Sequence, residues 1–269
     1  MSKLVSLRDL ATLRLTPPKH ERWIEPLRWV PLSPTEIQLA CRYFPLAVRI
    51  EGDRPRLGLL LGKNYIAHTL LSGDGQWCGA YRPIALRCFP FQAPGSSDDP
   101  LTDIAVATDT GFLSDGAGPP VLVDGKPNAW VVELHRLLQL LKRGEDSFAG
   151  AIDQLQIADL FEPLATADDS APADGASFHV LSPRRFAELG NGPLGAMARR
   201  SFLSLDIAVA GLFSLQNLKP ELRPKRADRI GPSSGDAAAF DAIAINDLPL
   251  ALDDGELVPL SDLVPEPVA

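Results

Sequence analysis

The sequence predicts an α+β fold, with a β-meander and short helices in the N-terminal part, central helices, and a C-terminal strand-helix unit. Short apolar runs in the first third of the chain are separated by Gly, Pro and Asp turns, which is typical of a meander. Later apolar residues recur at helical spacing, which predicts amphipathic helices. The 25 prolines among 269 residues favour short elements joined by many turns.

Composition divides the chain into five segments. We expect an N-terminal arm that either lies on the body or is mobile, an α+β part, a linker rich in Asp, Ala, Pro and Gly, a strand-helix part of the same domain, and a Pro/Asp-rich tail. These segments are residues 1–26, 27–164, 165–176, 177–218 and 219–269.

The clearest helix start is Ser33-Pro34-Thr35-Glu36. Ser33 can cap the helix, Pro34 suits its first position, and Glu36 can reach back as the reciprocal cap. The helix should end before Pro45 and bury Cys41 on its apolar face. Two apolar runs follow, residues 46–51 and 56–61, and the Gly-Asp-Arg-Pro turn between them predicts a hairpin or meander.

The stretch from Trp77 to Phe91 is the most aromatic part of the chain. Pro83 can open a short helix that Pro90 closes. Aromatic and arginine side chains around such an element suit a recognition surface for an acidic or apolar peptide. Packing at the edge of a core would explain the same composition. The partner-binding candidates are Trp77, Tyr81, Arg82, Arg87, Phe89 and Phe91.

Helical periodicity dominates the second half of the chain. Apolar residues recur at helical spacing on both sides of Gly144, which predicts a helix pair or one helix interrupted near residues 144–150. Residues 178–181 are predicted to form a strand, after which Ser182-Pro183 can start a helix. Residues 194–218 have the composition of one long apolar helix.

No motif in the sequence predicts catalysis. Gly231-Pro232-Ser233-Ser234-Gly235 matches the nucleophile-elbow pattern G-x-S-x-G, but no strand precedes it and no helix follows. The histidines and cysteines lack the spacing of metal ligands. They are His20, His68, His135, His179, Cys41, Cys78 and Cys88. We therefore expect no catalytic residue, no metal site and no cofactor.

The charge and hydropathy of the chain restrict its location and partners. A net charge of -8 disfavours nucleic acid and anionic lipid as partners. The longest nearly uncharged stretch, residues 201–217, is too short to span a bilayer, and the N-terminus lacks a signal-peptide pattern. An odd number of cysteines fits a reducing compartment. We expect a cytoplasmic protein without membrane insertion.

Four short motifs and one longer stretch form a recognisable set. They are Leu32-Ser33-Pro34-Thr35-Glu36, Arg42-Tyr43-Phe44-Pro45-Leu46, Tyr81-Arg82-Pro83, Arg87-Cys88-Phe89-Pro90-Phe91, and the stretch from Phe178 to Leu218. Together they resemble the SapC family of bacterial proteins. The resemblance implies an association with surface-layer proteins, and relatives are often labelled as peptide-transport components. It also implies genomic proximity to TonB-dependent receptors and tryptophan-halogenase-like proteins.

The resemblance supplies no catalytic residue that could be transferred to this chain. We therefore expect a non-enzymatic SapC-like accessory or binding protein that acts on a protein or peptide partner, in an oligomeric state that the sequence leaves open. The alternative is a partner-dependent modifying enzyme, which a deep pocket holding His68 or His135 beside a carboxylate would favour. A surface-layer structural component is a third possibility.

Overall fold

The structure is a computed structural model that describes residues 4–52, 54–93, 95, 97–107, 110–164 and 176–224. It has the predicted α+β class, with helices packed on antiparallel sheets. Nearly all of the expected linker, the nucleophile-elbow string and most of the expected tail lie outside the described residues. The division of the chain into five segments therefore stays a prediction.

A five-stranded antiparallel sheet forms the centre of the molecule, with strand order β11-β12-β4-β5-β3. Its strands are β3 (Trp29–Pro31), β4 (Leu46–Glu51), β5 (Arg54–Leu60), β11 (Phe161–Pro163) and β12 (Ser177–Leu181). The predicted hairpin is confirmed as β4 and β5, which pair from Leu46 opposite Leu59 to Glu51 opposite Arg54. Gly52 at the turn has a φ of 59°, which glycine adopts without strain.

The N-terminal segment lies on the body of the protein. Strand β1 (Leu4–Ser6) adds an edge to a three-stranded sheet of order β1-β7-β6, and β2 (Arg14–Leu15) pairs with β8 (Leu113–Ser114). Leu7 and Leu15 are buried, so this segment contributes to a core. The remaining short strands are β6 (Phe91–Gln92), β7 (Ala105–Ala107), β9 (Leu122–Val123) and β10 (Lys126–Pro127).

Three short helices and several 3-10 turns connect the strands. The predicted capping box is present, with Ser33 as the cap and Glu36 as its reciprocal partner, although the first turn is a 3-10 turn. Cys41 is buried as expected. Helix α2 follows Pro83, which is its N-cap and so lies one residue earlier than predicted. The elements are α1 (Ile37–Ala40), α2 (Ile84–Cys88), α3 (Pro100–Asp103), η1 (Leu7–Leu10), η2 (Arg22–Ile24) and η3 (Pro34–Glu36).

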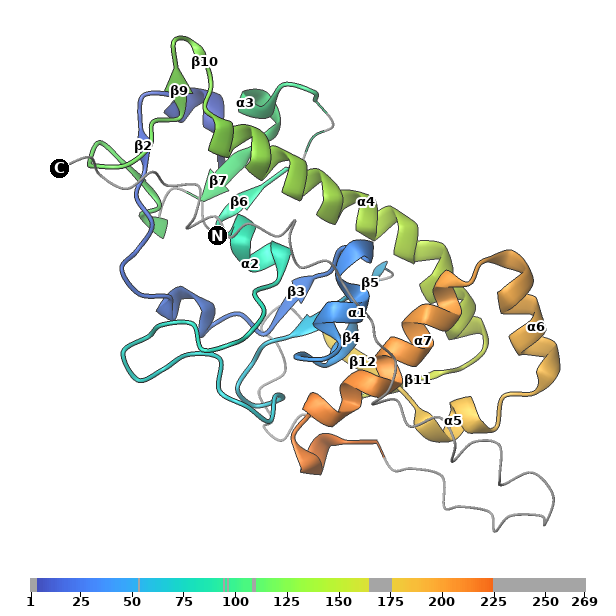
Figure 1. Ribbon diagram of the computed structural model, residues 1–269. Coiled ribbons are helices and arrows are strands. Elements are labelled where there is room, and N and C mark those ends of the chain that lie inside the picture. The colour runs from blue at the N-terminus through green and yellow to red at the C-terminus, as the bar shows by residue number, and fades with distance from the viewer. Residues whose placement is uncertain are drawn as a thin grey trace.

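The longest element is α4 (Ala129–Ile157), which runs along the whole body in Figure 1. It continues through Gly144, so the prediction of a helix pair or an interrupted helix is wrong. Its first half packs into one core cluster, with Leu7, Ile84 and Val106, and its second half packs into another, against the five-stranded sheet. The helix therefore joins two cores.

Gly144 is required by a close packing contact. A Cβ atom there would lie 2.8 Å from the carbonyl oxygen of Leu32 and 3.0 Å from Cδ of Pro34. Glycine allows α4 to approach the start of η3 this closely. The residue therefore serves packing between two segments instead of ending the helix.

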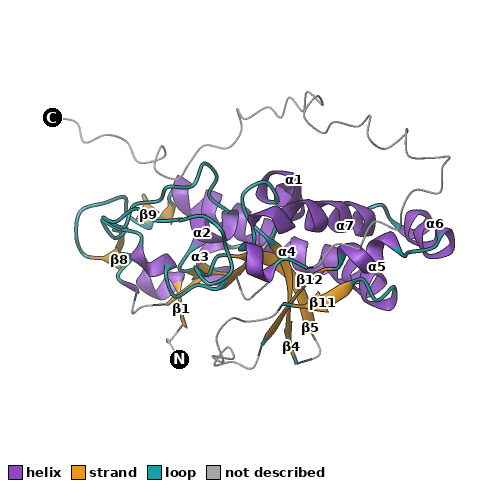
Figure 2. Ribbon diagram, turned by 90° about the horizontal axis from the view of Figure 1, so that it is seen from below, coloured by secondary structure: helices purple, strands orange, loops and turns teal. Residues whose placement is uncertain are grey.

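The C-terminal helices lie on the same side of the sheet as α4 (Figure 2). Helix α5 (Pro183–Ala187) begins at the predicted Ser182 cap. The expected long helix over residues 194–218 is wrong, because the chain forms α6 (Asn191–Arg200), α7 (Leu203–Ser214) and η5 (Leu215–Asn217). Ser201 is extended, and its Oγ accepts a hydrogen bond from the Leu203 N–H at 3.1 Å, so it ends one helix before the next begins.

The described chain ends shortly after η6 (Pro220–Leu222). Leu215, Leu218 and Leu222 pack with Trp29 and Tyr65 in a third buried cluster. In the part of the chain that the structure describes, no helix is both long and apolar enough to cross a membrane.

Two matched glycines on α4 test the packing role of Gly144. We expect Gly144→Ala to lower the free energy of unfolding by about 1–3 kcal/mol, because the new Cβ would press on Leu32 and Pro34. A Cβ atom at Gly150 would meet nothing within 4 Å, so Gly150→Ala should raise the free energy of unfolding by about 0.5–1 kcal/mol. Urea denaturation of both variants measures the difference. Equal effects would contradict the assignment.

Candidate functional site

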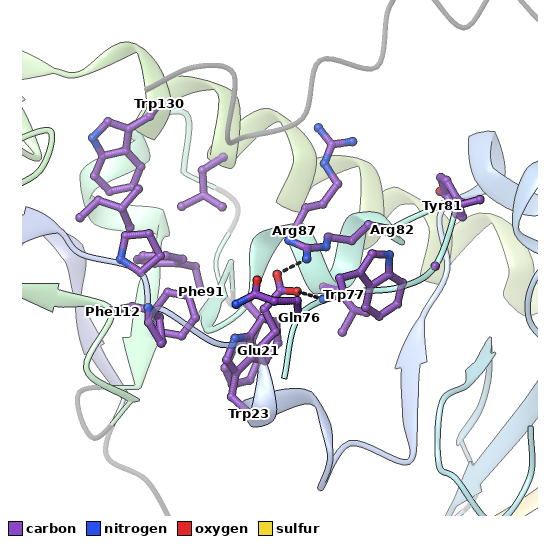
Figure 3. A pocket seen from close by; sticks show the side chains of 18 of the residues that line it. Glu21, Trp23, Gln76, Trp77, Tyr81, Arg82, Arg87, Phe91, Phe112 and Trp130 are labelled. Atoms are coloured by element: carbon purple, nitrogen blue, oxygen red, sulfur yellow. Dashed lines mark hydrogen bonds and ion pairs between the residues drawn. The ribbon is translucent and has the colours of Figure 1, made fainter. Parts of the chain in front are cut away.

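A cavity of about 840 Å³ opens between the N-terminal segment, α1, α2 and the first half of α4 (Figure 3). All six partner-binding candidates from the sequence line this cavity. It also takes side chains that the sequence analysis missed, from segments far from residues 77–91. These are chiefly Glu21, Trp23, Tyr43, Phe112 and Trp130.

Aromatic side chains form one end of the pocket. Trp23 and Phe89 stack with ring centres 4.3 Å apart and planes 5° from parallel. Phe112 meets both rings edge-on, with centres 5.7 Å away. Phe91 lies 6.0 Å from Trp130 by ring centres. Large rigid aromatic surfaces of this kind suit an apolar or aromatic side chain.

Glu21 organises the other end of the pocket. Its Oε2 accepts a hydrogen bond from the backbone N–H of Trp77 at 2.7 Å, and its Oε1 pairs with the Arg82 guanidinium. The guanidinium carbon also lies 5.4 Å from the centre of the Trp77 ring. Figure 3 shows these contacts as one group at the pocket wall. The three residues therefore hold one another in place, with the Arg82 side chain still 35% exposed.

A buried carboxylate, Glu36, lies behind the pocket wall. Its Oε1 accepts hydrogen bonds from the Tyr81 hydroxyl and from the Ile84 N–H, the latter at 2.7 Å, while Oε2 accepts from the Ser33 N–H at 3.1 Å. Burial raises the pKa of Glu36 above its usual value of 4.5, and the three donors oppose that rise. Burial and the nearby Glu36 carboxylate raise the pKa of Tyr81.

The local sequence explains why residues 77–91 face the pocket. Pro83 disfavours helix before it, and Pro90 follows the last turn, so α2 is confined to five residues. Ile84, Leu86 and Cys88 are buried, which leaves Arg87 on the pocket side of the helix. The peptide bond between Phe89 and Pro90 is cis.

The two interpretations of the aromatic segment, core packing and binding, describe different sides of the same residues. Phe91 is only 7% exposed and belongs to a core cluster. Trp77 and Tyr81 are partly buried and pack on the other core, where the ring of Trp77 lies 6.3 Å from that of Phe44. Phe91, Trp77 and Tyr81 also line the cavity. Core packing thus holds the pocket walls.

A family model for SapC matches residues 6–220 of the chain. The chain belongs to the SapC family. Every residue that lines the pocket lies inside the matched region, as do nearly all of the described elements. Comparisons with curated proteins and with solved structures found no match.

The histidines of this SapC-family chain lie outside the pocket lining. His135 on α4 instead faces α3, where its Nε2 lies 2.9 Å from Oδ2 of Asp103, and Gln139 donates to the same oxygen at 2.7 Å. Asp103 is 2% exposed, and its Oδ1 has no hydrogen-bond partner among the described residues. Of the residues described, no three His, Cys, Asp or Glu side chains are grouped to hold a metal ion.

The missed lining is brought together by contacts between segments that are distant in the sequence. Trp23 and Trp130 lie more than 50 positions from Trp77 in the sequence, on opposite sides of it. Their meeting depends on the pairing of β2 with β8 and on the position of α4. That pairing joins residues about 100 positions apart, as Arg14 opposite Ser114 shows, and no periodicity reveals it.

Removing the Tyr81 hydroxyl tests how the pocket wall depends on Glu36. The pKa of Glu36 is raised in the folded state. Glu36 therefore contributes fully to the free energy of unfolding below pH 4.5, and this contribution is lost as the pH rises through the raised pKa. The hydrogen bond from the Tyr81 hydroxyl stabilises the ionised Glu36 carboxylate, so it makes this loss of stability smaller. We expect Tyr81→Phe to cost about 1–3 kcal/mol of unfolding free energy at pH 7 and less at pH 4.

Urea unfolding across this pH range measures the effect. Tyr43→Phe is the matched control, because it removes the same hydroxyl from the neighbouring ring, 6.2 Å from Tyr81 by ring centres. It should leave the pH dependence unchanged. A Tyr81→Phe cost that is the same at both pH values would contradict the role given to Glu36.

Proposed function

We propose that this SapC-family protein is a non-enzymatic accessory protein that binds a protein or peptide partner in the aromatic pocket. The single observation that carries the proposal is the pocket itself, with stacked rings at one end and Arg82 at the other. Its volume falls within the range of about 300–1,000 Å³ typical of ligand sites. Tryptophan, tyrosine and arginine are also the residues that dominate binding energy at protein interfaces.

The two ends of the pocket define the chemistry of the partner. The rings of Trp23, Phe89 and Phe112 offer apolar surface for an aromatic or large aliphatic side chain. Arg82 carries five N–H donors, and its ion pair with Glu21 engages only part of them. A carboxylate on the partner would find the remaining donors at the rim. The partner segment would therefore combine an apolar anchor with an acidic group.

We place this activity in the cytoplasm and link it to outer-membrane uptake or surface-layer systems. The free cysteines Cys41, Cys78 and Cys88 support a reducing compartment, where disulfides are rare. The link to uptake or surface-layer systems rests on the associations that the family resemblance implies. Under this proposal the peptide-transport label describes binding of a transported or modified protein, with no channel formed by the chain.

A partner-dependent modifying enzyme is the second candidate, and one observation favours it. His135 lies beside the buried Asp103, an arrangement that can orient an imidazole for proton transfer. The pair lies outside the pocket lining, which makes binding the better supported function. If the chain is an enzyme, His135→Gln should abolish a mass change in an isolated partner that wild type produces. Retention of that mass change would exclude the pair.

Blocking the pocket tests the binding function. Ala80 lines the cavity and is exposed, so Ala80→Trp would fill the pocket without removing a packed side chain. We expect it to reduce recovery of a specific partner in pull-downs by about tenfold or more. Ala149→Trp is the matched control, since Ala149 is exposed on α4 outside the pocket lining.

Truncation of the pocket wall gives an independent measure. The double variant Trp77→Ala, Arg82→Ala removes the ring and the cation that face each other at the rim. Recovery of the same partner should fall as it does for Ala80→Trp. Unchanged recovery with both pocket variants would remove the pocket from the function.

A further inference from the structure

The net charge of the chain comes entirely from its last 39 residues. All 26 lysines and arginines lie before residue 231, while 8 of the 34 acidic residues lie after it. Residues 1–230 are therefore neutral overall, and residues 231–269 carry the whole charge of -8. The acidic residues of this segment are Asp236, Asp241, Asp247, Asp253, Asp254, Glu256, Asp262 and Glu266.

The same segment contains one aromatic residue, Phe240. It lies next to Asp241 and four residues after Asp236, and Ile243, Ile245 and Leu248 follow it. A large apolar anchor flanked by carboxylates is the chemistry for which the two ends of the pocket are built. The chain therefore contains a segment whose apolar and acidic side chains match the two ends of its own pocket.

The segment that follows α7 is tied to the segment that follows α1, whose neighbours line the pocket. Leu218 forms a β-bridge with Ile66, and the side-chain amide of Asn217 donates to the carbonyl of Cys41 at 2.9 Å. Cys41 directly follows α1 and lies between Leu39 and Tyr43, which both line the pocket. The described chain then continues to Leu222, which packs with Tyr65 in the third cluster, and Pro224 lies seven residues along the chain from the contact at Asn217.

The chain length between Pro224 and Phe240 is sufficient to reach the pocket. Sixteen residues extend to at most about 50–60 Å, and a flexible chain of that length averages about 20–24 Å end to end. A folded body of this size has a radius of gyration of about 17 Å. Covalent attachment over such a distance gives an effective concentration in the millimolar range.

We propose that residues 236–250 occupy the pocket in the same molecule, with Phe240 against the rings of the aromatic end and a neighbouring carboxylate on Arg82. The inference rests on the proposed binding function and adds its regulation, because an external partner must displace this segment before it can bind. The affinity for a partner is then set by competition between the two.

A second apolar surface is a weaker fit for the segment. Phe202, Val209 and Phe213 form an exposed stripe along α7, with exposed fractions of 68%, 61% and 39%. Asp206 is exposed at helical spacing within that stripe. Its carboxylate would repel an acidic segment, whereas the pocket lining holds Arg82 and Arg87 against one carboxylate, Glu21, and would attract such a segment. The α7 stripe is therefore the alternative binding surface for the segment, and the crosslinking experiment distinguishes it from the pocket.

Photocrosslinking in the full-length protein locates the segment. Phe240 is replaced by p-benzoylphenylalanine, the protein is irradiated at low concentration, and crosslinked positions are identified by mass spectrometry. We expect crosslinks within one molecule to pocket residues such as Pro18, Trp77 and Phe112. Crosslinks to α7, crosslinks only between two molecules, or none at all would overturn the proposal.

Competition in the full-length chain gives the functional readout. A synthetic peptide of residues 236–250 is titrated calorimetrically into wild type and into Phe240→Ala. The variant should bind the peptide at least about tenfold more tightly, because its internal competitor has lost its anchor. Equal affinities, or no binding to either protein, would overturn the proposal.

Two further variants separate this inference from the proposed function. Phe202→Ala removes an exposed ring from the α7 stripe and should bind the peptide as wild type does; a gain equal to that of Phe240→Ala would place the segment on α7 and overturn the proposal. Ala80→Trp combined with Phe240→Ala should bind no peptide. If Ala80→Trp still loses the partner while Phe240→Ala changes nothing, the binding function stands and the regulation alone fails.

Discussion

The Glu36 carboxylate holds together the segments on which the pocket depends. Its two oxygens accept hydrogen bonds from the Ser33 and Ile84 N–H groups and from the Tyr81 hydroxyl, so one buried side chain completes the start of η3, anchors the start of α2 and fixes the Tyr81 ring. Burying a carboxylate without such donors would cost free energy of folding, so the burial of Glu36 and its three hydrogen bonds depend on one another. These hydrogen bonds hold the pocket wall in place.

A second carboxylate, Glu21, repeats the same principle at the rim. It joins the N-terminal segment to Trp77 and Arg82, more than fifty residues away in the sequence. Helix α4 connects the core under the N-terminal sheet with the core under the five-stranded sheet. The pocket forms where the two cores meet, so its shape depends on the whole SapC domain and on no single loop.

Local chemistry predicted those parts of the fold that depend on neighbours in sequence. The Ser33 cap, the hairpin of β4 and β5, the short α2 and the Ser182 cap all follow from a few adjacent residues. The missed features depend on contacts between distant segments. Gly144 has the composition of a helix interruption, yet Leu32 and Pro34 lie against it. The apolar composition of residues 194–218 concealed the break that Ser201 makes between two helices. Trp23 and Trp130 reach the pocket only through strand pairing and helix position.

The concentration of indole rings around one cavity has a practical consequence. Three of the four tryptophans in the chain line the pocket, and the fourth, Trp29, packs on the sheet beneath Arg49 and Arg56. Emission from tryptophan depends on the polarity and quenching groups around the indole. Three of the four indole rings therefore lie at the candidate site, and the molecule carries its own optical reporter of whether that site is filled.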